Sequence, residues 1–484
     1  MLQKVNNNMV YKSILRKLSI IILGFVVIGC SPLKKLSVLA DMEPDHRQYF
    51  KNTMLYGYEK KTAIKVNVFD YKNADSLEDY LKRYSGRVNL VEVPLEKSDV
   101  LARKGFFKPL DSFLTSEELR FFNDNYLLGS FGMVSNRPTL IPRSFETPVL
   151  VYSKSKVAEA LKVWAANKEI ISQNLKVYNG FGLPEGYKLE SDPSSWDMYD
   201  IAVIGLLWIK GDNGGSRIAH VSSKSTDLLS FVEGGVYRCG GDSLAVMGCR
   251  GDAVYDFFHW ESVLSRSGVY NQKMWDKGWG RVELMDAYVN GEIYCMILPL
   301  GDCFRLHGTG HAERRGMLSN PDDLGLALLP QGCSVELDNN GNVIRRGGRG
   351  VATRSTWWAI PYNASSALLS YRLAKYLSDT LQHAAEVSRF GKIPVRKEVV
   401  DTMETLIKDV WTKKGLEVSL QQVVHNAEYI ISDRVYSQMY INFYIDLWYG
   451  MIVAQDWAQQ NGAIPERGYI KTSIEQRYQP KLYK

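Results

Sequence analysis

Glu96 and Glu146 are two carboxyl side chains of this 484-residue chain that could in principle form an acid–base couple. Two carboxyl groups can divide the roles of proton donor and base, as they do in a glycosidase. In their ionised form the same groups accept hydrogen bonds from the hydroxyls of a bound solute. Because an unpaired buried donor costs about 1–3 kcal/mol, such a binding site discriminates strongly between solutes.

Histidine and cysteine side chains give weaker signals. Cys303, His307 and His311 are metal ligands by type, but the glycines between them disfavour a helix and no CxxC pair accompanies them. No GxxxxGK[ST] loop occurs in the sequence, so we expect any ATP hydrolysis to belong to a partner. The polar run 338–342 lacks the terminal glutamate of a calcium loop and is better explained as a hairpin turn. We therefore expect no metal and no cofactor.

Five cysteines follow Cys30, so in an oxidising compartment at least one of them stays unpaired. Cys239 with Cys249, and Cys295 with Cys303, are the candidates for disulfides at short sequence separation. Free buried thiols that pack as small apolar residues are the alternative. The sequence leaves both possibilities open for these four residues and for Cys333.

The N-terminus has the pattern of a secretory leader. Basic Lys12, Arg16 and Lys17 precede the apolar run 18–28, which is too short to span a bilayer and ends in the box Val-Ile-Gly-Cys at Cys30. The segment resembles a bacterial lipoprotein leader, which implies cleavage before Cys30 and acyl chains such as palmitate on that cysteine. Because Ser31 is not acidic, the outer membrane is favoured if the organism has two membranes.

Removing residues 1–29 changes the charge balance. The whole chain carries +6, and four of these six charges lie in the leader, so the mature chain keeps +2. No long run of lysine or arginine occurs elsewhere, which argues against a nucleic-acid partner. The mature chain is long and apolar enough for two lobes or more.

Strands and helices alternate from the start of the mature chain. Strands are predicted over residues 36–40, 64–69 and 88–93, with helices over 47–60 and 76–84 between them. This order implies parallel strands joined by right-handed crossovers. Ligands of such sheets bind beyond the carboxyl ends of the strands. The C-terminal part is predicted to be helical, with the apolar segment 423–459 as a core helix or a face for a partner.

Seven segments, in order along the chain, resemble the extracellular solute-binding proteins of bacterial ABC importers, in the large family that includes maltose-type sugar binders. They are 64–69, 87–113, 141–155 (IPRSFETPVLVYSKS), 193–203, 287–302, 357–379 and 391–399. Three departures bear on the identity of the ligand. Asn89 stands where the family usually has aspartate, Cys295 replaces alanine or methionine, and the loop at Asp302 lacks the tryptophan common in oligosaccharide binders.

The resemblance implies an α/β, two-lobed periplasmic-binding-protein-like fold with a ligand cleft between the lobes and a helical C-terminal region. The expected organisation is a signal peptide at 1–29, the first part of lobe 1 at 30–150, the first part of lobe 2 at 151–355, a return to lobe 1 at 356–400, and a helical part packing on lobe 2 at 401–484.

The resemblance also implies a function without catalysis: a lipid-anchored extracytoplasmic receptor, in the periplasm or at the cell surface, that captures a sugar or oligosaccharide for the permease subunits of an ABC importer. By register, Glu96 and Glu146 fall where the family places carboxylates that accept from ligand hydroxyls. Arg143 would pair with Glu146, grip an acidic ligand or form a hinge salt bridge. The other residues expected to bind ligand are Asp41, Glu43, Thr226, Tyr237, Asp302 and Trp357.

Two other functions stay open. The same scaffold carries enzymes, among them bacterial thiaminases with a cysteine nucleophile, and paired carboxylates would suit a glycan-active enzyme. The cysteines here do not follow a lobe-one strand, where that nucleophile would be expected. A surface-capture or scaffold lipoprotein with a vestigial cleft is the third interpretation.

Overall fold

The computed structural model describes residues 35–71, 76–127, 132–212, 215–309, 316–424, 445–453 and 467–478. The predicted leader, Cys30, His311 and much of the predicted helical segment 423–459 lie outside these residues. The chain divides into two compact units. Unit 1 comprises Met1–Glu92 with Ile360–Leu377, and unit 2 comprises Val93–Ala359 with Ser378–Lys484.

Unit 1 is built on parallel strands in the order β2-β1-β3. β1 (Lys35–Leu39) pairs with β2 (Lys65–Phe69) on one side and with β3 (Leu90–Pro94) on the other. Leu36, Val38 and Leu39 of the middle strand are buried, whereas the residues of β2 alternate between exposed and half-buried. The predicted parallel β-α-β-α-β order is confirmed.

The described helices of unit 1 form one long helical run and two separate helices. α2 (Pro44–Tyr49), a π-helical turn (Phe50–Leu55) and α3 (Tyr56–Thr62) follow one another without a break, where a single helix over 47–60 was predicted. α4 (Leu77–Arg83) and α15 (Ala367–Leu377) are the others. A Cβ added to Gly57 would lie 2.6 Å from the hydroxyl of Tyr376, so a larger residue at this position of α3 would require the end of the Tyr376 side chain to shift.

Unit 2 contains two sets of strands. β4 (Gly132–Val134), β5 (Arg137–Glu146) and β10 (Arg354–Ala359) form antiparallel ladders with β5 in the middle. The second sheet has the order β7-β8-β6-β9, made by β7 (Ile218–Ala219), β8 (Cys295–Pro299), β6 (Pro148–Ser153) and β9 (Leu324–Ala327). Buried Thr147 is the one residue between β5 and β6, so the chain passes directly from one set to the other after Glu146.

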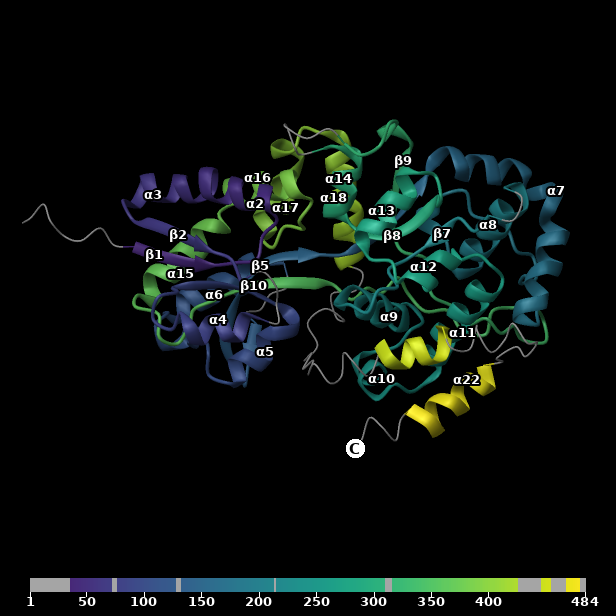
Figure 1. Cartoon of the computed structure of the whole chain (residues 1–484), viewed down its shortest axis with the longest axis horizontal. Coiled ribbons are helices and arrows are strands. Elements are labelled where there is room, and N and C mark those ends of the chain that lie inside the picture. Colours follow the sequence, from purple (N-terminus) through teal and green to yellow (C-terminus); the bar gives the residue numbers. More distant parts are fainter. Residues whose placement is uncertain are drawn as a thin grey trace, which may run out of the picture. The chain divides into compact units, whose positions relative to one another are not determined.

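Helices cover the strands of unit 2, and Figure 1 shows α7 running alongside α8. Those that carry site residues are α9 (Thr226–Arg238), α13 (Arg281–Val289), α14 (Leu300–His307) and α16 (Thr380–Phe390). The remaining α-helices are α5 (Leu95–Arg103), α6 (Ser116–Asn125), α7 (Lys154–Asn179), α8 (Met198–Gly211), α10 (Ser243–Gly248), α11 (Asp252–Arg266), α12 (Gln272–Lys277), α17 (Lys397–Leu406), α18 (Val410–Val424) and α22 (Arg467–Ser473).

A long segment after β9, residues 331–350, is tied to the helices by buried polar contacts. Trp260 Nε1 donates to the carbonyl of Cys333 over 2.7 Å, and Arg345 forms a bidentate pair with Asp256 over 2.8 Å. The tip of the segment is a turn in which Gly341 N donates to the carbonyl of Asp338 over 2.9 Å, which confirms the predicted hairpin turn at 338–342. We refer to residues 331–350 as the clasp segment.

The five cysteines that the structure describes are free thiols, and all but Cys239 are buried. The alternative of buried free thiols therefore holds over the disulfide pairs considered from the sequence. No described helix combines the length and the apolar character needed to cross a membrane.

Candidate ligand-binding site

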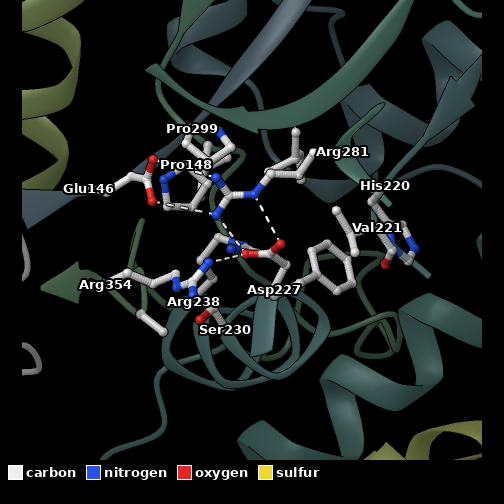
Figure 2. Close-up of a pocket in the computed structure, with 14 residues that line it drawn as sticks. Glu146, Pro148, His220, Val221, Asp227, Ser230, Arg238, Arg281, Pro299 and Arg354 are labelled. Carbon is white, nitrogen blue, oxygen red and sulfur yellow. Dashed lines mark hydrogen bonds and ion pairs between the residues drawn. The ribbon is translucent and has the colours of Figure 1, made fainter. Parts of the chain in front are cut away.

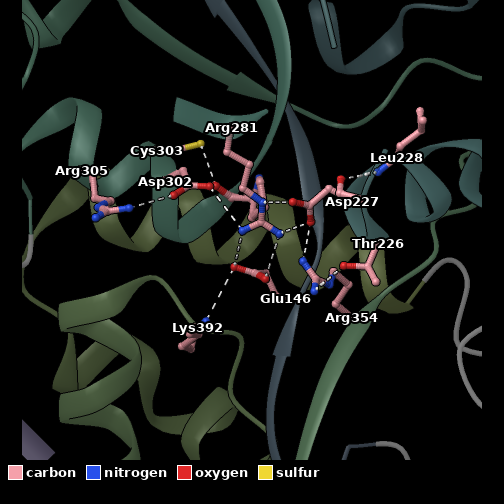
Figure 3. Close-up of polar contacts among 12 residues, drawn as sticks. Glu146, Thr226, Asp227, Leu228, Arg281, Asp302, Cys303, Arg305, Arg354 and Lys392 are labelled. Atoms are coloured by element: carbon pink, nitrogen blue, oxygen red, sulfur yellow. Dashed lines mark hydrogen bonds and ion pairs between the residues drawn. The ribbon is translucent and has the colours of Figure 1, made fainter. Parts of the chain in front are cut away.

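Arg281 lies at the centre of a group of charged side chains in unit 2 (Figure 3). It donates to Asp227 of α9 from Nη2 over 2.6 Å and from Nε over 3.0 Å. The carboxylate of Glu146 lies 3.4 Å from Nη1 and from Nη2, and Asp302 of α14 lies 3.4 Å from Nη1. One guanidinium thus faces three carboxylates from three separate elements.

Two more cations complete this group. Lys392 Nζ lies 3.6 Å from Glu146 Oε1. Arg354, the first residue of β10, donates to the carboxylate of Asp227 and, over 3.1 Å, to the hydroxyl of Thr226. We call Glu146, Asp227, Arg281, Asp302, Arg354 and Lys392 the charge cluster.

The ends of helices and strands position the charge cluster. Ser225 caps α9 by accepting from the backbone N–H of Leu228, which places Asp227 in the first turn, where the helix dipole favours a carboxylate. Arg281 is the first residue of α13. The partial positive charge at the N-terminus of a helix disfavours a cation at this position. The orientation of Arg281 therefore depends on the carboxylates around it. Glu146 is the last residue of β5, immediately before the crossing to β6.

Burial and neighbouring charge shift the pKa values of two carboxyl groups beside Arg281 in opposite directions. Burial would raise the pKa of Glu146, but Lys392, Arg281 and Arg354 outweigh it and hold that pKa well below its ordinary value. For Asp302, burial prevails over Arg281 and raises the pKa. Glu146 is therefore a fixed anion at neutral pH, suited to accept hydrogen bonds and not to donate a proton.

A pocket lies beside the charge cluster (Figure 2). The cavity volume of the pocket is ≈ 40 Å³. A single water needs roughly 10–15 Å³ on the same measure, so the pocket has room for more than one water. Arg238 and Ser230 join the charged residues on its polar side, and Pro148, Val221 and Phe231 contribute an apolar surface. The ring of His220 stacks on Phe231 with centroids 3.9 Å apart. A few converging polar groups on an apolar, aromatic wall are typical of small-molecule sites.

The structure brings together three of the residues expected to bind ligand: Glu146, Thr226 and Asp302 all contact members of the charge cluster. Tyr237 is buried within α9, one residue before Arg238. Trp357 is half-buried in β10, and its indole N–H has no hydrogen-bond partner among the described residues. These two residues remain candidates by resemblance.

Arg143 forms a salt bridge inside unit 2. Its Nη1 donates to Glu386 Oε2 of α16 over 2.6 Å, and both residues are buried. Its guanidinium also lies over the ring of Trp358, 5.1 Å from the centroid. Of the roles considered for Arg143, the salt bridge is the one for which the structure supplies a partner.

The remaining candidates lie apart from the charge cluster in the sequence. In unit 1, Asp41 and Glu43 follow β1 and are exposed. Partial burial of its carboxyl group, reinforced by the charge of Asp70, raises the pKa of Asp41 to about 6. Glu96 lies in α5 of unit 2, and its side chain is outside the described part of the structure. The lipidation candidate Cys30 is also outside it.

Sequence inspection missed Asp227, Arg281, Arg354, Lys392 and Arg238. Signals existed for two of them. Asp227 follows the helix-capping pair Ser225-Thr226, and Lys392 falls in the family-like segment 391–399. The arginines carry no local signal. Arg281 lies 54 positions from Asp227 and 135 from Glu146, and Arg354 lies 127 positions from Asp227.

Four of the five described cysteines are poorly suited to nucleophilic chemistry. Burial raises the pKa of Cys239 and of Cys295 to about 12, and it also raises those of Cys303 and Cys333. These four thiols are protonated at neutral pH, whereas the thiolate is the nucleophile. Across the described ranges, no three histidine, cysteine or acidic side chains gather as a metal site would require.

No protein-family model matches the chain, and no curated protein sequence matches it significantly. Solved structures do match. Maltose-bound MalE3 of T. maritima gives a TM-score of 0.63 at 13% identity, over 93% of this chain and 99% of that one. UgpB from Mycobacterium tuberculosis, in complex with glycerophosphocholine, gives 0.60 at 14% identity, over 92% and 98%. The GacH receptor of Streptomyces glaucescens, solved unliganded and with acarbose, gives 0.59 at 13%, over 93% and 100%.

These matches extend over nearly the whole of each chain. The protein therefore has the α/β, two-lobed fold of periplasmic binding proteins, as the sequence predicted.

Proposed function

We propose that this protein is an extracytoplasmic solute-binding protein that captures a small solute, a sugar or an oligosaccharide, for an ABC importer. The observation that carries the proposal is the fold, shared over nearly the whole chain with binding proteins such as maltose-bound MalE3 and the GacH receptor. The pocket beside the charge cluster supports it.

The chemistry of the pocket suits a polyhydroxylated solute. The ionised carboxylates of Glu146 and Asp227 accept hydrogen bonds from hydroxyls, while Arg281 and Arg354 donate to hydroxyl oxygens. The ring of Phe231, on which His220 stacks, lines the pocket and would face the C–H side of a sugar ring. Because three cations hold Glu146 as an anion, it is suited to accept hydrogen bonds from a solute and not to act as the proton donor of an acid–base couple.

A screen of ligands tests this function. The purified protein is heated with neutral sugars, oligosaccharides and acidic sugars, and a bound solute is expected to raise the melting temperature in proportion to its concentration over Kd. E146Q should lose most of that shift. E159Q is the matched control, because Glu159 is an exposed residue of α7 that pairs only locally with Lys156. If no solute in the screen raises the melting temperature, the proposal fails.

We further propose that acyl chains on Cys30 anchor the protein to a bacterial membrane, where it delivers the solute to permease subunits. The support is the leader pattern in the sequence. Cells fed an alkyne-labelled palmitate should label the wild-type protein, and C30A should lose both the label and the membrane fraction. Equal labelling of C30A would contradict the anchor.

A further inference from the structure

Arg238, the last residue of α9, is a buried cation that lines the pocket (Figure 2). The residue is 5% exposed. Its guanidinium forms no salt bridge and no hydrogen bond with the residues that the structure describes, and it lies 5.8 Å from the centroid of the Phe231 ring. A buried charge is normally paired or hydrogen-bonded, because its desolvation is otherwise uncompensated.

Among the described residues, no acid forms a salt bridge with Arg238, and the charge that reaches it from Glu261 acts from a distance. The pKa of Cys239 is raised to about 12 and that of Tyr270 is also raised, so both are uncharged at neutral pH. The nearby acid Glu261 accepts from the hydroxyl of Tyr270 over 3.0 Å and lies 3.3 Å from His220 Nε2. The carboxyl end of α9 contributes a partial negative charge but no full anion.

The other charges of the pocket are already committed to each other. Its lining contains the arginines 238, 281 and 354 but only two carboxylates, Glu146 and Asp227. Asp227 accepts from both Arg281 and Arg354, and Glu146 faces Arg281 and Lys392. Of the three arginines that line the pocket, Arg238 is therefore the one without a salt bridge to a described residue.

The clasp segment holds the backbone of Arg238 in place. Gly348 N donates to the carbonyl of Arg238 over 2.9 Å. A Cβ added to Gly332 or to Gly347 would overlap the carbonyl group of Arg238. At both glycines the backbone of the clasp segment therefore packs directly against the backbone of Arg238. A guanidinium on so fixed a backbone is preorganised for a ligand.

We infer that Arg238 binds an anionic group of the solute, a carboxylate or a phosphate, so that the protein captures an acidic sugar. This inference rests on the proposed function and names the class of solute for the same pocket. A guanidinium matches either oxyanion with two parallel hydrogen bonds. The anionic group would lie beside Arg238, with the remainder of the solute extending toward Glu146 and Asp227, which line the same pocket.

Calorimetric titration with matched pairs of solutes tests the inference. Galacturonate and trigalacturonate are compared with galactose and maltotriose for the carboxylate arm, and glucose 6-phosphate with glucose for the phosphate arm. The acidic member of one arm should bind, and R238Q should weaken that binding by roughly 10- to 100-fold, the loss of a charge-assisted hydrogen bond. R137Q is the control, because Arg137 is a surface arginine of β5 paired with Asp111.

R238K provides a second variant, which keeps the charge but not the fork of donors, and it should retain weakened binding. The unliganded R238Q protein should melt at or above the temperature of the wild type, since it loses an unpaired buried charge. If neutral sugars bind as tightly as their acidic partners, or if R238Q and R238K both bind the acid as the wild type does, the inference is overturned and solute capture stands. If no solute binds to the wild type, both proposals fail.

Discussion

Arg143 of β5 and Glu386 of α16 form an ion pair whose side chains are 2% and 1% exposed. Arg143 lies three residues before Glu146 on the same strand. The pair therefore fixes the end of β5, from which the carboxylate of Glu146 projects into the charge cluster. A residue expected to touch ligand thus acts on the site through the strand.

R143M should lower the free energy of unfolding by about 3–5 kcal/mol, because Glu386 would be left buried without its cation. The double variant R143M/E386M should recover part of this loss, since both buried charges are gone. Urea denaturation of the two single variants and the double variant measures the coupling. A loss below about 1 kcal/mol for R143M would show that the pair contributes little.

Two adjacent glycines provide a matched test of the clasp segment. G347A places a Cβ against the carbonyl of Arg238 and should destabilise the protein by about 1–3 kcal/mol, with weaker solute binding. G348A places its Cβ in open space and should leave the melting temperature nearly unchanged. Equal effects of G347A and G348A on the melting temperature would contradict the close packing.

R281M should destabilise the protein by about 2–4 kcal/mol at pH 7, because three carboxylates lose their common cation. R137M, which breaks an exposed pair with Asp111, should cost no more than about 1 kcal/mol. Chemical denaturation at low and high salt separates the two cases. The larger loss for R281M should persist at high salt, since partly buried pairs are screened little.

His259 predicts acid sensitivity. Burial, with smaller contributions from Arg467 and Arg266, lowers its pKa to about 3 from 6.5. The unfolded chain therefore binds a proton at this histidine at a higher pH than the folded protein does, and its contribution to stability, complete above about pH 6.5, is lost as the pH falls toward 3. H259Q should show a shallower decline in stability than the wild type from pH 7 to pH 4. Parallel declines would rule out this role for His259.

Asp41 predicts a pH dependence of the opposite sign. Its pKa is raised from 3.8 to about 6, so the folded protein binds the proton more tightly than the unfolded chain. The stabilisation is complete below about pH 3.8 and is lost as the pH rises through 6. D41N should therefore gain stability relative to the wild type as the pH rises from 4 to 7. A carboxyl pKa near 4 in a ¹³C NMR titration of Asp41 would contradict the shift.

Local pattern was enough to predict the parallel strands of unit 1. Apolar and polar residues alternate in 64–69, and this segment forms the edge strand β2. The apolar run at 36–40 forms most of the buried strand β1. Both patterns are properties of neighbouring residues in the sequence. The π-helical turn between α2 and α3 was not predictable, because the 3.6-residue periodicity of the segment continues through it.

The site was predictable only in part, because its charges come from remote parts of the chain. Glu146 and Asp302 were found through family register, yet the residue that joins them is Arg281, 135 positions after the first of the two. Arg238 gave no signal, because a buried arginine resembles any arginine near a helix end until its surroundings are known.

The turn at 338–342 has a use that follows from its two ends. Asn339 and Asn340 at its tip are exposed, while the clasp segment to which they belong bonds to the carbonyl of Arg238. An environment-sensitive dye attached to a cysteine introduced at position 340 would be exposed to solvent. It would lie on the same segment that contacts the backbone of Arg238, a residue of the pocket. Because the native cysteines other than Cys239 are buried in the described structure, labelling would favour that position, and the protein could be built into a fluorescent sensor for its own solute.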